Sequence, residues 1–137
     1  MWIWIILIIL ASWAVYSSRE DPVLTEVKKR YDKLRDNPPE GMDKLKEPIV
    51  ITGFRERYGE IGYNVNKGYE IGLCLDGTAN DVFHVLIHEL AHSVTKSYAH
   101  NEEFWKNFDK IKKHCVKMKI YEPIKTKKDF CGKFIRD

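Results

Sequence analysis

Five residues in the middle of the chain have the types and the spacing that metal-assisted hydrolysis needs. They are His88-Glu89-Leu90-Ala91-His92, in which two histidines stand four positions apart and a glutamate follows the first. On a helix, residues i and i+4 share one face, so two imidazoles can bind one zinc ion from a rigid scaffold. Glu89 lies beside them and is our candidate general base for attack by a zinc-activated water. We therefore predict one zinc ion bound by His88 and His92, with Glu89 catalytic.

A catalytic zinc needs a third protein ligand and one open position. His100 is the favoured candidate, because it follows His92 after seven residues, where a turn would bring the chain back toward the metal. Glu103 is the alternative and would act as a carboxylate ligand from the first turn of the next helix. Tyr98 is one candidate for a donor that stabilises the oxyanion of the transition state.

The motif must lie on a helix, and the flanking sequence predicts one. Thr78 is a candidate N-cap with Asp81 three residues later, and apolar residues follow at helical spacing as far as Val94. A further helix is predicted to begin at Asn101. The side chains expected on its core-facing side are Phe104, Trp105, Phe108, Ile111 and Cys115. We expect His84, one turn before His88, to be packed or to support a ligand.

Before the motif helix, three segments have the apolar character of strands, namely residues 48–54, 61–65 and 69–75. Asn66-Lys67-Gly68 is a hairpin signal between the last two. We expect a small, mostly antiparallel sheet of about three strands. The segment 69–75 is predicted either to form an edge that pairs with extended substrate or to lie inside the sheet.

The N-terminus is strongly apolar, and between Trp2 and Tyr16 the one serine is Ser12. Residues 1–18 carry no charged side chain and would span roughly 27 Å as a helix, close to the hydrocarbon thickness of a bilayer. A cleaved signal peptide normally begins with basic residues, and a core helix normally has a polar stripe; neither is seen here. We predict an uncleaved transmembrane anchor at 1–18, with cleavage as the alternative, then a helical linker region at 19–47 with a helix over 23–35.

Flanking charge and cysteine content predict the orientation of this anchor. Six Lys and Arg residues lie between Arg19 and Arg35 and none before the helix, so the positive-inside rule places the C-terminal domain on the cytosolic side. Cys74, Cys115 and Cys131 are odd in number and form no CxxC pair, which argues against a disulfide framework and for a reducing compartment. Cys74 is expected to be buried and inert.

The segment from His84 to Ile111 resembles the WLM and SprT-like zinc metallopeptidases. The resemblance is carried by His88-Glu89-Leu90-Ala91-His92 and by the run from His100 to Trp105, in which Phe104 opens the next helix. It implies an α+β fold with a minimal zincin-like domain over residues 48–137, zinc held by His88, His92 and His100, and Glu89 as the base. Members of these families act on proteins crosslinked to DNA, and similar compact proteins occur in large DNA viruses.

Two other functions compete with a peptidase acting on proteins or peptides. The chain could be a structural, membrane-tethered component of a larger assembly such as a virion, with little or no catalytic activity. The tail from Lys110 to Asp137 has ten Lys and Arg against three acidic residues, so contact with nucleic acid or anionic lipid is a third hypothesis. The residues concerned are Lys112, Lys113, Lys117, Lys119, Lys125, Lys127 and Lys128. A solvated helical face is the simpler explanation of these lysines.

Overall fold

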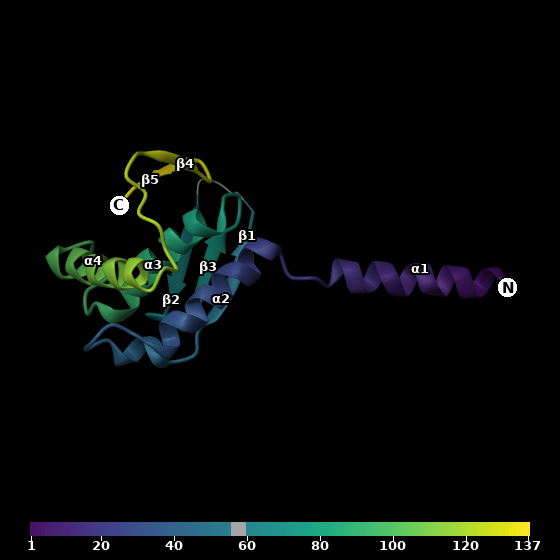
Figure 1. Cartoon of the computed structure of the whole chain (residues 1–137), viewed down its shortest axis with the longest axis horizontal. Helices are drawn as coiled ribbons and strands as arrows, with labels where there is room; N and C mark the ends of the chain where they lie inside the picture. The colour runs from purple at the N-terminus through teal and green to yellow at the C-terminus, as the bar shows by residue number, and fades with distance from the viewer. Residues whose placement is uncertain (56–59) are drawn as a thin grey trace.

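The computed structural model describes residues 1–55 and 60–137, and within these ranges helices and strands form one α+β body with a separate N-terminal helix (Figure 1). The elements, in chain order, are α1 (Trp2–Ser17), α2 (Pro22–Asp36), a short 3-10 helix (Asp43–Lys46), β1 (Val50–Phe54), β2 (Gly62–Val65), β3 (Glu70–Cys74), α3 (Ala79–Val94), α4 (Glu102–Lys117), β4 (Lys128–Phe130) and β5 (Lys133–Ile135). The predicted α+β class is confirmed.

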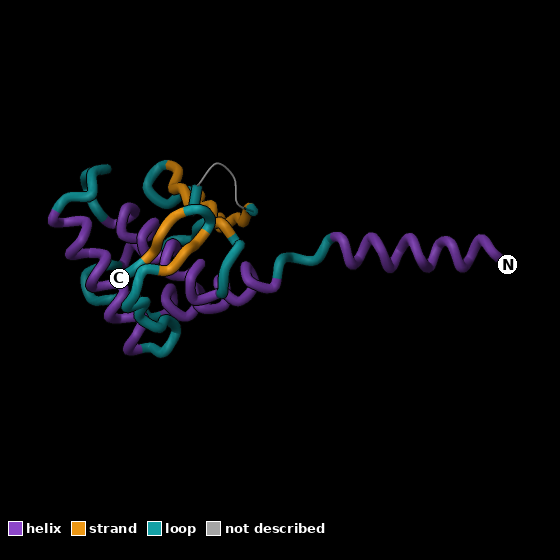
Figure 2. Tube along the Cα trace, turned by 90° about the horizontal axis from the view of Figure 1, so that it is seen from above, coloured by secondary structure: helices purple, strands orange, loops and turns teal. Residues whose placement is uncertain are grey.

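Helix α1 stands clear of the body, as Figures 1 and 2 both show, and none of its residues is buried. Its side chains are apolar on every side of the helix, so no face is marked for packing against the domain. Sixteen residues give a length of about 24 Å, less than the roughly 30 Å of a bilayer core. Among the described helices, none by itself meets the length and hydropathy expected of a membrane span; α1 and α2 meet them only together, with a bend of 48° between them.

Helix α2 belongs to the folded body. Asp21 caps its first turn by accepting a hydrogen bond from the Val23 amide at 2.8 Å, and Pro22 is well suited to the first helical position. Leu24, Val27, Tyr31 and Leu34 recur at helical spacing and are all buried in the main core. Residues 19–47, predicted as a helical linker region, therefore contribute to the same core as the residues that follow.

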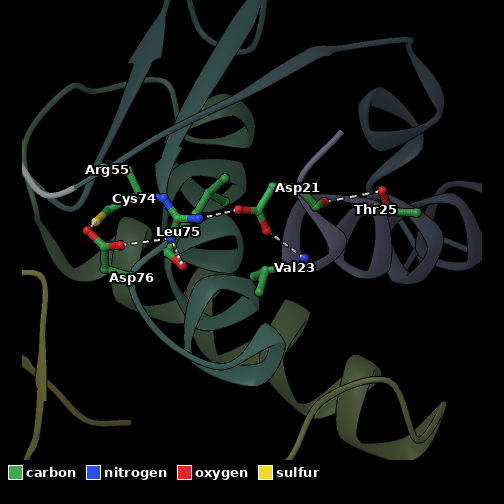
Figure 3. Close-up of polar contacts among 7 residues, drawn as sticks. All are labelled: Asp21, Val23, Thr25, Arg55, Cys74, Leu75 and Asp76. Atoms are coloured by element: carbon green, nitrogen blue, oxygen red, sulfur yellow. Dashed lines mark hydrogen bonds and ion pairs between the residues drawn. The ribbon is translucent and has the colours of Figure 1, made fainter. Parts of the chain in front are cut away.

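Arg55 joins the start of α2 to the end of the sheet (Figure 3). Its guanidinium donates to the Asp21 carboxylate at 2.5 Å and to the Asp76 carboxylate at 2.8 Å, and it also reaches the Leu75 carbonyl at 3.5 Å. Asp21 thus serves both the helix cap and this ion pair. The contact fixes the position of α2, and with it the point at which α1 leaves the body.

The three-stranded sheet has the order β1-β3-β2. Strand β2 pairs with β3 antiparallel, but β1 pairs with β3 parallel, so the prediction of a mostly antiparallel sheet is wrong for one of its two pairings. Asn66 and Lys67 both have positive φ, and with Gly68 they make the predicted turn between β2 and β3. Because β3 has a partner on each side, the hypothesis that segment 69–75 is an edge is also wrong. Strand β2 is the edge nearest the motif helix.

Helix α3 lies against β2, β3, α2 and α4, so it is the centre of the core. Thr78 and Asp81 form the predicted capping box, in which the Thr78 hydroxyl accepts from the Asp81 amide and the Asp81 carboxylate accepts from the Thr78 amide. Asn101 caps α4 through a bond from the Phe104 amide at 3.0 Å, as predicted. These two caps fix where the helices begin, and so which of their side chains face each other.

The C-terminal segment forms a hairpin, β4–β5, which the sequence analysis did not predict (Figures 1 and 2). A disulfide joins Cys131, in its turn, to Cys74 at the end of β3, and Phe130 is buried beside Gly77. Cys115 is the free, buried cysteine. The expectation that the cysteines form no disulfide is therefore wrong, and Cys74, although buried as predicted, is not an inert thiol. The odd count misled because one cysteine is a core residue of α4 and only the other two are paired.

Candidate metal centre

Three imidazoles converge at the junction of α3 and α4. His88 and His92 project from one face of α3, and His100 reaches them from the residue before the Asn101 cap. The Nε2 atoms of His92 and His100 are 3.0 Å apart, and those of His100 and His88 are 3.2 Å apart. Residues twelve positions apart in the chain thus present their ring nitrogens to a single point.

The donor set fits a zinc ion. With Zn–N bonds of about 2.05 Å in a tetrahedral site, ligand nitrogens lie about 3.3 Å apart, close to the separations found here. Three ring nitrogens facing each other cannot all donate, so a cation among them would satisfy their lone pairs. Burial, followed by the charges of His92 and His100, lowers the pKa of His88 to about 3, and burial and His100 also lower the pKa of His92. Neutral imidazoles are the form that binds zinc.

Aromatic side chains support the three histidines from behind. Phe104 is fully buried, and its ring centroid lies 4.4 Å from that of His92, 4.8 Å from that of His100 and 5.0 Å from that of His88. Phe104 and Phe108 are core residues, as predicted. Trp105 is not, because half of its surface is exposed and its ring borders His88 and His100 at 6.3 and 6.0 Å. It forms part of the rim of the site.

Glu89 is buried next to the histidines and under β2. Gly62, at the start of β2, lets the strand approach α3 closely: a Cβ there would lie only 2.7 Å from Val85, whereas its distance of 3.6 Å from Glu89 would be an ordinary contact. Burial raises the pKa of the Glu89 carboxyl to about 7. The carboxyl can therefore take up and release a proton near neutral pH, as a general acid–base catalyst must.

An open cleft of about 210 Å³ leads to the centre. It is lined by Glu89 and His92 of α3, by Asn64 and Lys67 of the β2–β3 hairpin, and by Tyr98 of the loop after α3. Tyr98 is 76% exposed. The cleft therefore gives access to Glu89 next to the β2–β3 hairpin.

The other candidate residues lie elsewhere. Glu103 is exposed on α4 and is not one of the three residues whose ligand atoms converge. His84 is buried as predicted, and its Nδ1 lies 2.9 Å from the Tyr121 hydroxyl and 3.0 Å from the Asp137 carboxylate. A second convergent group, Cys74, Asp76 and Cys131, includes the two sulfurs of the disulfide, which are not thiolate ligands in this state.

Two residues beside the centre were missed by sequence reasoning. The Asn64 amide donates to the Glu89 carbonyl at 2.7 Å and to the Ser93 hydroxyl at 2.8 Å, and Lys67 reaches the C-terminal end of α3. Asn66-Lys67-Gly68 indicated only a turn. The sequence also shows that this turn precedes the motif helix. That position does not reveal which residues the turn contacts in the fold.

Comparison with known proteins is consistent with this geometry. The family model described as WLM domain matches residues 51–134. The crystal structure of Wss1 from Saccharomyces cerevisiae is similar in fold, with a TM-score of 0.56 and 19% sequence identity, over 71% of this chain and 77% of the Wss1 chain. A search of curated proteins finds no match. Because the family model covers more than half of the sequence and spans the histidine cluster, the chain belongs to the WLM family of zincin-like metallopeptidases.

Proposed function

We propose that this protein is a zinc-dependent peptidase that is attached to a membrane through α1, with zinc held by His88, His92 and His100. The observation that carries the proposal is the convergence of three Nε2 atoms, two of whose separations are 3.0 and 3.2 Å, beside a buried glutamate. Three histidines leave one position open, which is the arrangement of a catalytic rather than a structural zinc.

The chain's own groups would divide the reaction between them. When bound, zinc supplies an acidified water and polarises the scissile carbonyl. Glu89 accepts the proton of the attacking water and returns it to the leaving amine, a role that its pKa of about 7 suits. Among the described strands β2 lies at the edge of the sheet, so its backbone groups could pair with an extended peptide that adds as a strand beside the cleft. Tyr98, on the cleft wall, remains the candidate oxyanion donor.

The test is zinc content and cleavage of an unfolded protein such as casein, using the full chain in detergent. Glu89→Gln should retain one zinc per chain and lose activity by about 10²- to 10⁴-fold. Glu103→Gln is the matched control: it removes an exposed carboxylate on the next helix and should retain both zinc and activity. Zinc without cleavage in the wild type would favour the structural, assembly-component alternative, and no zinc would refute the metal site.

The membrane part of the proposal rests on the uniformly apolar, exposed surface of α1. Flotation with liposomes should carry the full chain but not residues 19–137. The basic residues after α1 favour a domain on the cytosolic side, whereas the Cys74–Cys131 disulfide is typical of oxidising compartments. Protease protection in sealed membrane vesicles decides between these two orientations.

Contact of the basic tail with nucleic acid or anionic lipid stays a prediction. Lys112 and Lys113 pair with Asp109, and Lys128 pairs with Asp81, which reduces the charge that these lysines present. Binding to DNA or anionic vesicles that falls steeply with salt would support the hypothesis.

A further inference from the structure

The loop between α3 and α4 must be held in place for His100 to reach the other two histidines. His100 is exposed and lies six residues beyond the end of α3, so its position depends on the conformation of residues 95–99. Local bonds fix part of this loop: the Thr95 hydroxyl donates to the Ala91 carbonyl at 2.6 Å, and the Ala99 amide donates to the Ser97 hydroxyl at 3.1 Å. The Asn107 amide of α4 also donates to the Thr95 hydroxyl at 3.0 Å, which ties the first residue of the loop to α4 but leaves residues 96–99 without a bond to α4 among those described.

Lys67 ties the loop, as far as Ser97, to the turn between β2 and β3. Its ammonium donates to the His92 carbonyl at 3.1 Å, the Thr95 carbonyl at 2.5 Å and the Ser97 carbonyl at 2.6 Å. It also lies 4.2 Å from the centroid of the Tyr98 ring, within the range of a cation–π contact. A lysine ammonium has three hydrogens, so the three carbonyls account for all of its hydrogen bonds, and the ring contact is an additional cation–π interaction.

The backbone that carries Lys67 is itself attached to α3. Lys67 occupies a positive-φ position in the turn, next to Asn66, which also has positive φ. Asn64 bonds to the Glu89 carbonyl and the Ser93 hydroxyl through its amide nitrogen, and its amide oxygen accepts from the Gly68 amide at 2.6 Å. The turn therefore has a fixed position relative to α3, and the ammonium acts from a fixed point.

We propose that Lys67 is a positioning residue for the metal centre: it holds the loop 95–99 so that His100 completes the zinc site. This inference rests on the proposed zinc function. Because its donors are directed at carbonyl oxygens of the protein, Lys67 acts on the loop rather than on a substrate carboxylate. Groups that orient metal ligands in this indirect way typically change metal affinity by 10- to 100-fold when they are removed.

Lys44 provides a matched control. Its ammonium donates to the Ser93 carbonyl at 2.7 Å, so it also binds the last turn of α3, but at a residue that precedes the loop. Lys44→Met and Lys67→Met remove the same charge and the same donors from the same end of one helix. A general effect on the helix terminus would appear in both variants, whereas an effect through His100 would appear only in Lys67→Met.

The experiment measures the zinc dissociation constant by competition with a chromophoric chelator, using the full chain in detergent. Lys67→Met should weaken zinc binding at least about 10-fold, Lys44→Met by less than about 3-fold, and Lys67→Arg should recover part of the loss. In a His100→Ala background, Lys67→Met should have no further effect, because the ligand that it positions is already absent.

Equal zinc affinity in Lys67→Met and wild type would overturn the inference, as would an undiminished effect in the His100→Ala background. If Lys67→Met does not fold, Lys67→Gln, which keeps a shorter polar side chain, is measured with the same expectations. Failure of the wild type to bind zinc would instead refute the proposed function, so the two failures are distinguishable.

Discussion

Helices α1 and α3 are both sixteen residues long and both rich in apolar side chains, yet they have opposite surroundings. Eleven residues of α3 are buried, and none of α1 is. Three buried polar residues of α3 have a partner: Asp81 in the capping box, His84 against Tyr121, and Ser93 against Asn64. The fourth, Glu89, is buried beside the three histidines, and its pKa is raised as a result. Helix α1 has no charged group and no protein surface against it. The comparison shows that apolar content alone does not place a helix in a core; a patterned face does.

The largest expected effect separates the two helices directly. Leu86 of α3 is fully buried and Leu7 of α1 is about half exposed. Leu86→Ala should lower the free energy of unfolding by about 4 kcal/mol, because it leaves a cavity in a packed core. Leu7→Ala should change it by less than about 0.5 kcal/mol. Urea unfolding of the full chain in detergent measures both, and similar losses in the two variants would contradict the contrast.

The folded domain also differs from α1 in having a covalent cross-link, the disulfide between the end of β3 and the C-terminal hairpin. Cys131→Ser opens a cross-link between residues 57 positions apart and should lower the free energy of unfolding by about 3 kcal/mol. A reductant should have the same effect on the wild type but not on the variant. Cys115→Ser is the control, because it changes a buried thiol without opening a cross-link. No difference between reduced and oxidised wild type would contradict the prediction.

The buried carboxyl of α3 predicts a pH dependence that α1, without charged side chains, cannot have. The folded-state pKa of Glu89 is raised by burial to about 7 from 4.5, so its contribution to stability is present below pH 4.5 and is lost as the pH rises toward 7. In the zinc-free protein, Glu89→Gln should therefore be more stable than wild type at pH 8 by up to about 3 kcal/mol. Thermal unfolding at pH 5 and pH 8 should show this advantage shrinking at pH 5. A constant difference would contradict the assigned burial.

The smallest expected effect concerns Asp21, the N-cap of α2, which lies between α1 and the folded domain. Asp21→Ala removes the cap of α2 and should cost about 1 kcal/mol of unfolding free energy. Asp21→Asn keeps a capping oxygen and loses only the charge that faces Arg55, so its loss should be smaller (Figure 3). Denaturant midpoints for the two variants test this. An equal loss in both would make the ion pair, not the cap, the dominant contribution.

Much of the fold near the centre could be predicted because its signals are local. Each of these signals involves residues within one or two helical turns of each other: the spacing of His88 and His92, the capping box of Thr78 and Asp81, and the cap at Asn101. Parallel pairing of β1 with β3 could not be predicted, because it depends on β2 lying on the far side of β3, and alternation of side chains does not encode strand order.

Long-range contacts account for the other failures. Cys74 and Cys131 are joined across most of the domain, and the β4–β5 hairpin that brings them together is short and basic, with a weak strand signal. Lys67 had only the signature of a turn residue. Trp105 was assigned to the core from its helical spacing, but it lies at the open edge of the α4 face beside His100.

The most direct test of the central claim is the ligand environment of zinc in the full chain, measured by X-ray absorption at the zinc edge. We expect one zinc per chain with three nitrogen ligands at about 2.0 Å and one oxygen from water. Loss of this signal in His100→Ala and its retention in Glu103→Gln would identify the third ligand. Sulfur ligands at about 2.3 Å would place the metal at Cys74 and Cys131 instead, and would contradict the account.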